Sequence, residues 1–131
     1  MLDIHKKSIK IADSELEIMR VLWREGRPLS FTEIRTALES TTDWKKTTIQ
    51  TMLVRLRDKG VITARQDHVA LYTPNITEDE YIQAEGQHFI NRLFDGSAAK
   101  LAATLCRGGR LNEADVDELK AYFQMEGGGK K

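Results

Sequence analysis

Apolar residues recur with helical spacing along the first part of the chain, between residues that start and stop helices. The first stretch begins beside Asp13 and Ser14, which can cap a helix, and ends at the Gly-Arg-Pro run of residues 26–28. The second begins at Ser30, whose hydroxyl can form a capping box with Glu33. The pattern therefore predicts two helices separated by a sharp turn.

A third helix is expected from Trp44 to Lys59, with Gly60 just beyond its end. At about 100° per residue, four apolar side chains fall on one arc and should face the core: Ile49, Met52, Leu53 and Leu56. The opposite side carries polar side chains, which are short toward the N-terminal end. An ordinary amphipathic helix with a solvated face would show the same pattern, so this pattern alone leaves the function open.

Two short segments with β-branched residues, 61–65 and 69–73, follow the third helix across a polar turn, which favours a β-hairpin. A short strand at Pro28-Leu29 could pair with the edge of this hairpin. Three helices followed by a hairpin is the order of a winged helix-turn-helix. We therefore expect a mainly α protein in which residues 1–75 form a winged-helix domain.

The rest of the chain also contains residues that typically start and stop helices. Thr77 and Glu80 can form a second capping box, for a helix that runs to about Phe94. Residues 98–106 form an Ala- and Leu-rich stretch, and Asn112 can cap a last helix. Three further helices are therefore expected.

Residues 76–126 are too few to close a core of their own, because the buried fraction of the surface falls steeply in small domains. We expect their apolar stripes to pack against a second copy of the chain, so that 76–126 form a helical dimerisation domain and 127–131 a flexible tail. Packing back onto the winged helix of the same chain is the alternative. The candidate dimer contacts are Ile82, Phe89, Leu93, Leu101, Leu105, Val116, Leu119 and Phe123.

The composition is that of a globular protein, since 40% of the 131 residues are hydrophobic and 31% are charged. The single cysteine, Cys106, excludes an intramolecular disulfide, suits a reducing compartment and is expected to be buried. No apolar run reaches the roughly 20 residues of a membrane span, so we expect a cytoplasmic protein without membrane contact. The histidines are scattered and no metal-ligand spacing occurs, so neither a metal, a cofactor nor catalysis is expected.

The 20 Lys and Arg residues balance the 20 Asp and Glu residues, but their distribution favours nucleic acid. Residues 44–59 hold five basic side chains and one acidic one, a concentration that suits phosphate contact. The expected contacts in a DNA groove are Thr47, Thr48, Gln50, Thr51 and Arg55. The expected phosphate contacts are Lys45, Lys46, Arg57 and Arg65, with His68 at the tip of the wing.

Two other functions remain open on the residues alone. A winged helix can serve as a protein-interaction module, in which case Val54 and the hairpin would contact a partner protein. A repressor gated by a small molecule, with a pocket between the wing and the dimerisation domain, is also compatible with the sequence. No polar cluster in the sequence defines such a ligand.

The segments 11–23 and 43–60 resemble the penicillinase-repressor family (BlaI/MecI/CopY type), and the resemblance continues through Tyr72 and residues 89–94. Its most specific part is the pattern Thr-x-x-Thr-aliphatic-x-x-Arg-Leu-x-x-Lys-Gly, which ends at Gly60. The resemblance implies a homodimeric winged-helix transcriptional repressor. It would bind a dyad-symmetric operator and form its dimer through the C-terminal helices.

Members of this family that respond to β-lactams are cut by a sensor protease at an Asn-Phe bond, and the matching position here is Thr104-Leu105. The resemblance thus adds a candidate cleavage site and a sensor protease as a candidate partner, although neither side chain matches. Copper-responsive members carry a C-terminal cluster of cysteines, and the single Cys106 excludes that mechanism. The inducing signal and the operator sequence are left open.

Overall fold

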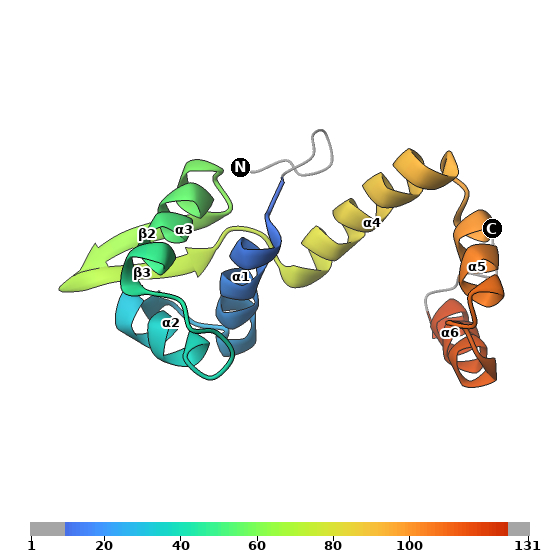
Figure 1. The fold of residues 1–131 in the computed structure, drawn as a ribbon, viewed down its shortest axis with the longest axis horizontal. Coiled ribbons are helices and arrows are strands. Elements are labelled where there is room, and N and C mark those ends of the chain that lie inside the picture. The colour runs from blue at the N-terminus through green and yellow to red at the C-terminus, as the bar shows by residue number, and fades with distance from the viewer. Residues whose placement is uncertain (1–9, 126–131) are drawn as a thin grey trace. The chain divides into compact units, whose positions relative to one another are not determined.

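The computed structural model describes residues 10–125, and these divide into two compact units that part between Glu85 and Gly86. The expected mainly helical architecture with a small antiparallel sheet is confirmed (Figure 1). The elements are α1 (Asp13–Glu25), β1 (Leu29–Ser30), α2 (Phe31–Leu38), α3 (Lys46–Asp58), β2 (Ile62–Asp67), β3 (Val69–Pro74), α4 (Glu78–Phe94), α5 (Ala98–Arg107) and α6 (Glu113–Met125).

The core of the first unit is built from the apolar stripes of α1, α2 and α3. The four side chains of α3 that periodicity assigns to the core are all buried, which confirms that prediction. They pack in one cluster with buried residues of α1 and α2, such as Leu22 and Ile34, which are both 0% exposed. Because full burial of such a side chain contributes about 1.5–3 kcal/mol, this cluster fixes α3 against the other two helices.

The sheet has the strand order β1-β3-β2, and both pairings are antiparallel. Leu29 pairs with Tyr72, so the short first strand joins the edge of the hairpin as predicted, one residue later than expected. The hairpin turns tightly, with Asp67 opposite Val69 and His68 alone between them. His68 takes a left-handed φ of 61°, which is strained for a residue other than glycine.

Helix caps explain most of the boundaries in this unit. Ser30 and Glu33 form the predicted capping box, with N–H to side-chain distances of 2.9 and 3.2 Å, and Gly26 ends α1 at a φ of 68°. The predicted cap of α1 is wrong, because Ala12 occupies the N-cap position and has no side-chain oxygen. Its backbone N–H instead donates to Glu15 Oε1 at 3.0 Å, so a carboxylate one turn into α1 replaces the missing cap.

The first turns of α4 belong to the first unit. Thr77 and Glu80 form the second predicted capping box, with distances of 2.9 and 3.0 Å. Tyr81 is buried near the Trp23 ring, with 6.0 Å between the ring centroids. Burial, reinforced by the nearby carboxylates of Glu85, Asp13 and Glu15, raises the pKa of Tyr81 to about 12. The first unit therefore continues beyond residue 75 into the middle of α4.

The second unit comprises the rest of α4, α5 and α6. Asn112 caps α6 as predicted, accepting from the Asp115 N–H at 2.9 Å. No residue of α5 or α6 is buried in the single chain, and the prediction that Cys106 is buried is wrong: it lies exposed on α5. The expected tail, 127–131, lies outside the described residues. None of the helices within 10–125 is long and apolar enough to cross a membrane.

Candidate nucleic-acid interface

The outer face of α3 presents the side chains that sequence analysis assigns to a DNA groove. The five residues assigned to the groove are all exposed: Thr47, Thr48, Gln50, Thr51 and Arg55. Val54 lies on the same side of the helix and is 44% exposed. These side chains offer groups that contact base edges and phosphates: threonine hydroxyls and methyls, a glutamine amide and an arginine guanidinium. The buried core stripe holds the opposite side of the helix, so this outer face is displayed rigidly.

The N-terminal end of α3 is electropositive. Lys45 occupies the N-cap position without making a side-chain cap, Lys46 is the first helical residue, and the first turn contains no acidic side chain. The first N–H groups of a helix lack intrahelical acceptors and add a partial positive charge. Two exposed lysines beside them raise the attraction for an anion, which is the arrangement expected for phosphate contact.

A shallow hollow joins this face to the start of α1. It has a volume of about 260 Å³ and is lined by Ser14, Trp44, Thr48, Thr51, Met52 and Arg55. Sequence analysis placed Ser14 in a helix cap and Trp44 at the start of α3, and so missed that both line a hollow with Thr48, Thr51 and Arg55. No local signal marks them, because only the packing of α1 against α3 brings them together.

The wing lies on the β2–β3 hairpin. Arg65 and His68 are both exposed there, and Gln66 Nε2 donates to the carbonyl of His68 at 3.3 Å, which supports the tight turn. Asp67 shares a hollow of about 350 Å³ with Arg65 on this hairpin. Its negative charge weakens the attraction of the tip for phosphate and leaves Arg65 as the main cation of the wing.

Comparison with known proteins now adds to this geometry. The sequence profile described as "Penicillinase repressor" matches residues 11–125. The chain belongs to the penicillinase repressor family. It is 33% identical to the penicillinase repressor of Bacillus licheniformis over 127 residues, 96% of this chain and 98% of that protein. It is 25% identical to the penicillinase repressor of Staphylococcus aureus over 115 residues, 87% of this chain and 90% of that protein.

Two solved structures resemble the winged-helix part of this family member. The solution structure of the DNA-binding domain of the repressor BlaI is 42% identical, with a TM-score of 0.51, over 58% of this chain and 93% of that one. The monomeric form of Bacillus licheniformis BlaI in complex with the blaP half-operator is also 42% identical, with a TM-score of 0.50 and the same coverage. Identity over the DNA-binding domain thus exceeds the 33% found over the full length.

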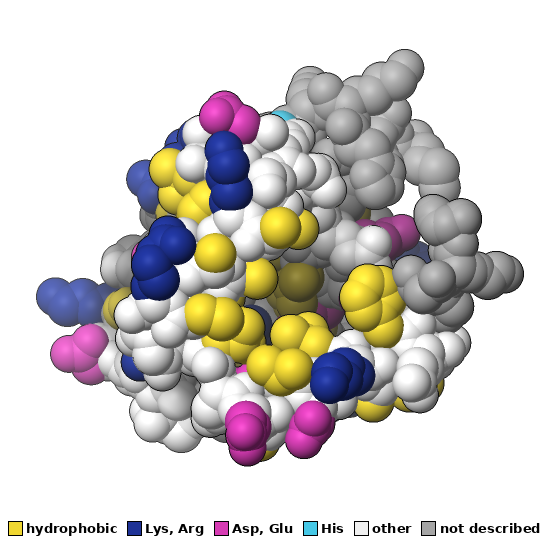
Figure 2. All heavy atoms as spheres, turned by 90° about the vertical axis from the view of Figure 1, so that its right-hand side faces the viewer, with side chains coloured by type: hydrophobic (Ala, Val, Ile, Leu, Met, Phe, Trp, Pro, Cys, Tyr) yellow, Lys and Arg dark blue, Asp and Glu magenta, His cyan; other side chains and the backbone are white. Residues whose placement is uncertain are grey.

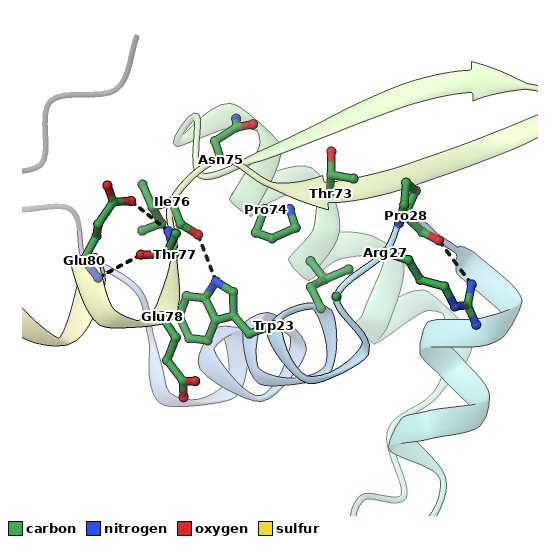
Figure 3. Close-up of a pocket in the computed structure, with 12 residues that line it drawn as sticks. Trp23, Arg27, Pro28, Thr73, Pro74, Asn75, Ile76, Thr77, Glu78 and Glu80 are labelled. Carbon is green, nitrogen blue, oxygen red and sulfur yellow. Dashed lines mark hydrogen bonds between the residues drawn. The ribbon is translucent and has the colours of Figure 1, made fainter.

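A third hollow of this penicillinase repressor family member, about 480 Å³ in volume, lies between the end of α1 and the start of α4 (Figure 3). Several of its polar groups are already paired. Trp23 Nε1 donates to the Ile76 carbonyl at 2.9 Å, and Arg27 donates to the Pro28 carbonyl at 3.3 Å and forms an ion pair of 3.0 Å with Glu33. The hollow offers an apolar floor with few free polar groups, so the geometry defines no ligand chemistry.

Apolar side chains gather on the C-terminal helices, the side that faces the viewer in Figure 2. Seven of the eight predicted dimer contacts are exposed in the single chain, from Leu105 at 36% to Phe123 at 60%, and the eighth, Leu101, is partly buried. Sequence analysis missed two further exposed apolar residues of α6, Tyr122 at 54% and Met125 at 76%. Large exposed apolar patches are typical of interaction sites in proteins.

Proposed function

We propose that this chain is a transcriptional repressor that binds operator DNA through the outer face of α3 and the β2–β3 wing. The exposed, polar and cationic outer face of α3 is the observation that carries the proposal. It is supported by the 42% identity to BlaI, a repressor whose monomeric form is known in complex with a half-operator. Such a repressor acts where the chromosome is, which we take to be the cytoplasm.

In this proposal the residues near the groove floor contact bases, and the more distant ones contact the DNA backbone. Thr47, Thr48, Gln50 and Thr51 have short side chains that let the helix approach base edges, and Arg55 reaches guanine or phosphate. The more peripheral cations contact the backbone and set the register of the complex without reading sequence. These are Lys45, Lys46, Arg57, Arg65 and the wing-tip His68.

We further propose that the repressor is a homodimer built through α4, α5 and α6. This is supported by the absence of any buried residue in α5 and α6 within 10–125, together with the exposed aromatic and aliphatic side chains on them. A two-fold dimer presents two copies of α3, which would bind half-sites separated by about 34–36 Å or a multiple of it. The operator would then be a dyad.

Cleavage at Thr104-Leu105 is not part of the proposed mechanism. This bond lies inside α5, where Thr104 Oγ1 also donates to the Lys100 carbonyl at 2.9 Å. Proteases cleave exposed, locally unfolded backbone, so cutting here would require α5 to open first. The inducing signal is therefore left unassigned.

The test begins with selection of DNA fragments by the purified protein, which should return a dyad sequence. Arg55→Ala should then weaken binding to that sequence by about 1–3 kcal/mol and relax preference at one base position, measured by fluorescence anisotropy. Arg24→Ala, at the far end of α1, removes the same charge from an exposed site and should leave binding nearly unchanged. Equal affinity of wild type and Arg55→Ala at every salt concentration would contradict the proposal.

A protein-interaction module is the second candidate, favoured by Val54 at 44% and Val69 at 54% exposure on the same faces. Random duplex DNA separates the two functions. A DNA-binding protein should bind it at low salt and lose it as salt rises, because phosphate neutralisation releases counterions. A protein-interaction module should not bind it at any salt concentration.

A further inference from the structure

Glu15 is the one charged side chain among the described residues that is fully buried, with 2% exposure. Its Oε1 accepts from the Ala12 N–H at 3.0 Å and from Lys59 Nζ, and the same ammonium donates to the carbonyl of Lys10. One carboxylate thus ties together the start of α1, the segment that precedes it and the residue that ends α3. Sequence analysis counted Lys59 only as a cation and did not foresee this pair.

The Glu15 carboxyl is held in its charged form. Burial alone would raise the pKa of the Glu15 carboxyl, but the hydrogen bonds from Lys59 and Ala12 and the charges of Lys59 and Arg55 outweigh it, so this pKa lies below its usual value. No buried side-chain nitrogen or oxygen among residues 10–125 lacks a partner. The carboxylate is therefore satisfied in one specific arrangement of α1 and α3.

Stability is a poor explanation for this pair. Replacing a buried ion pair by apolar residues of similar size is often neutral or stabilising, whereas removing one partner is strongly destabilising. Apolar packing between helices tolerates small rotations and shifts, but a charge pair with fixed donors and acceptors does not. What the pair adds over an apolar contact is thus a defined position for α3.

That position matters on the DNA side of the molecule. Ser14, the neighbour of Glu15, lines the same hollow as Thr48, Thr51 and Arg55. The charge of Arg55 also acts on Glu15, and Arg55 lies one helical turn before Lys59. Any shift at the Glu15 contact would therefore move the side chains assigned to the groove.

We propose that Glu15 is a positioning residue for operator recognition: through Lys59 it fixes the rotation and axial position of α3, and it withdraws Lys59 from the cations that bind phosphate. This inference rests on the proposed function, because it concerns how the recognition face is held. It assigns Lys59 a role different from that of Lys45 and Lys46, which carry the same charge at the other end of the helix.

The decisive variant replaces both partners, Glu15→Leu with Lys59→Met. We expect a folded protein whose melting temperature falls modestly, because the Ala12 N–H loses its acceptor, but whose ratio of operator to random-DNA affinity is about tenfold lower. Lys59→Arg, which keeps the charge, should retain most of the ratio. The control is Glu17→Gln with Arg20→Gln, which removes an exposed ion pair of 3.8 Å from the same helix and should change neither quantity.

A salt titration tests the withdrawal of Lys59 from phosphate binding. Each phosphate contact contributes about 0.9 to the slope of log affinity against log salt concentration. The double variant Glu15→Leu with Lys59→Met should leave this slope unchanged, whereas Lys46→Met should reduce it by about one contact. A reduced slope for the double variant would overturn this part of the inference.

Positioning of α3 is also measurable without DNA, which separates this inference from the proposed function. Amide resonances of α3 should shift or broaden along the helix in the double apolar variant, while the Glu17 and Arg20 control should perturb α1 alone. If the double variant fails to fold, Glu15→Gln serves in its place and should perturb the same amides. Unchanged α3 resonances, or an unchanged operator ratio in a stable variant, would overturn the inference.

Discussion

The two units of this chain differ in how far their apolar side chains are buried within the single chain. Residues 10–85 close a core in which Ile18, Met19, Leu22, Ile34 and Leu56 are inaccessible to solvent. In residues 86–125, α5 and α6 contain no buried residue although they carry several large apolar side chains. The first unit thus has a core that allows it to fold alone, whereas we expect the second to gain its stability from a partner surface.

The largest effect is expected from cutting the chain after Glu85. The shortened protein keeps every residue of the core and should remain folded, since that core lies wholly within residues 11–84. It should be monomeric and bind a full dyad operator about 10²- to 10⁴-fold more weakly, because the second half-site no longer benefits from linkage. Sedimentation and anisotropy measure the two quantities. A truncated protein that still dimerises would contradict the contrast between the units.

A pair of leucine substitutions tests the same contrast by stability. Leu56→Ala, at a 0% exposed site of the first unit, should reduce the free energy of unfolding by about 2–5 kcal/mol at any protein concentration. Leu119→Ala, at a 50% exposed site of α6, should instead lower the melting temperature by an amount that depends on protein concentration. A difference in melting temperature between wild type and the Leu119 variant that does not change with protein concentration would argue that α6 is not an interface.

The sequence predicted those features that depend on neighbouring residues. The capping boxes of Ser30 and Thr77 and the core stripe of α3 follow from spacings of three or four residues, and the structure confirms them. The capping residue of α1 was predicted wrongly for a non-local reason: Glu15 accepts from the Ala12 N–H and at the same time binds Lys59, which is remote in sequence. An ion pair between residues so far apart in the sequence produces no periodic pattern by which it could be predicted.

In the candidate site, too, sequence predicted the features that depend on neighbouring residues and missed those that depend on the packing of separate elements. Helical periodicity predicted which side chains of α3 are exposed, because the core stripe determines the opposite face. It could not predict that Ser14 and Trp44 would line a hollow with Arg55, since this needs the packing of two helices. Nor could it predict the exposure of Cys106, because an amphipathic helix without a partner in its own chain looks the same in sequence as a core helix.

Acid should weaken the first unit through Glu15. The folded-state pKa of Glu15 is below its usual 4.5, so its contribution to stability is complete above the unfolded-state pKa and is lost as pH falls through the folded-state pKa. The difference in unfolding free energy between wild type and Glu15→Gln should therefore shrink from pH 7 toward acid. Urea unfolding at several pH values measures it. A difference that stays constant from pH 7 to acid would contradict the ion pair between the buried Glu15 carboxylate and Lys59.

The smallest predicted effect lies at the junction of the two units, where Gly86 occupies the interior of α4. A Cβ at this position would meet nothing within 4 Å, so Gly86→Ala should stabilise the helix by about 0.5–1 kcal/mol. Gly26 has equally open surroundings but a φ of 68°, so Gly26→Ala should be destabilising instead. Thermal unfolding followed by circular dichroism compares the two. If Gly86→Ala also destabilises the protein, and does so more at high protein concentration, then α4 approaches the second chain of the dimer closely at this glycine. The dimer interface would then begin at Gly86, where the two units meet.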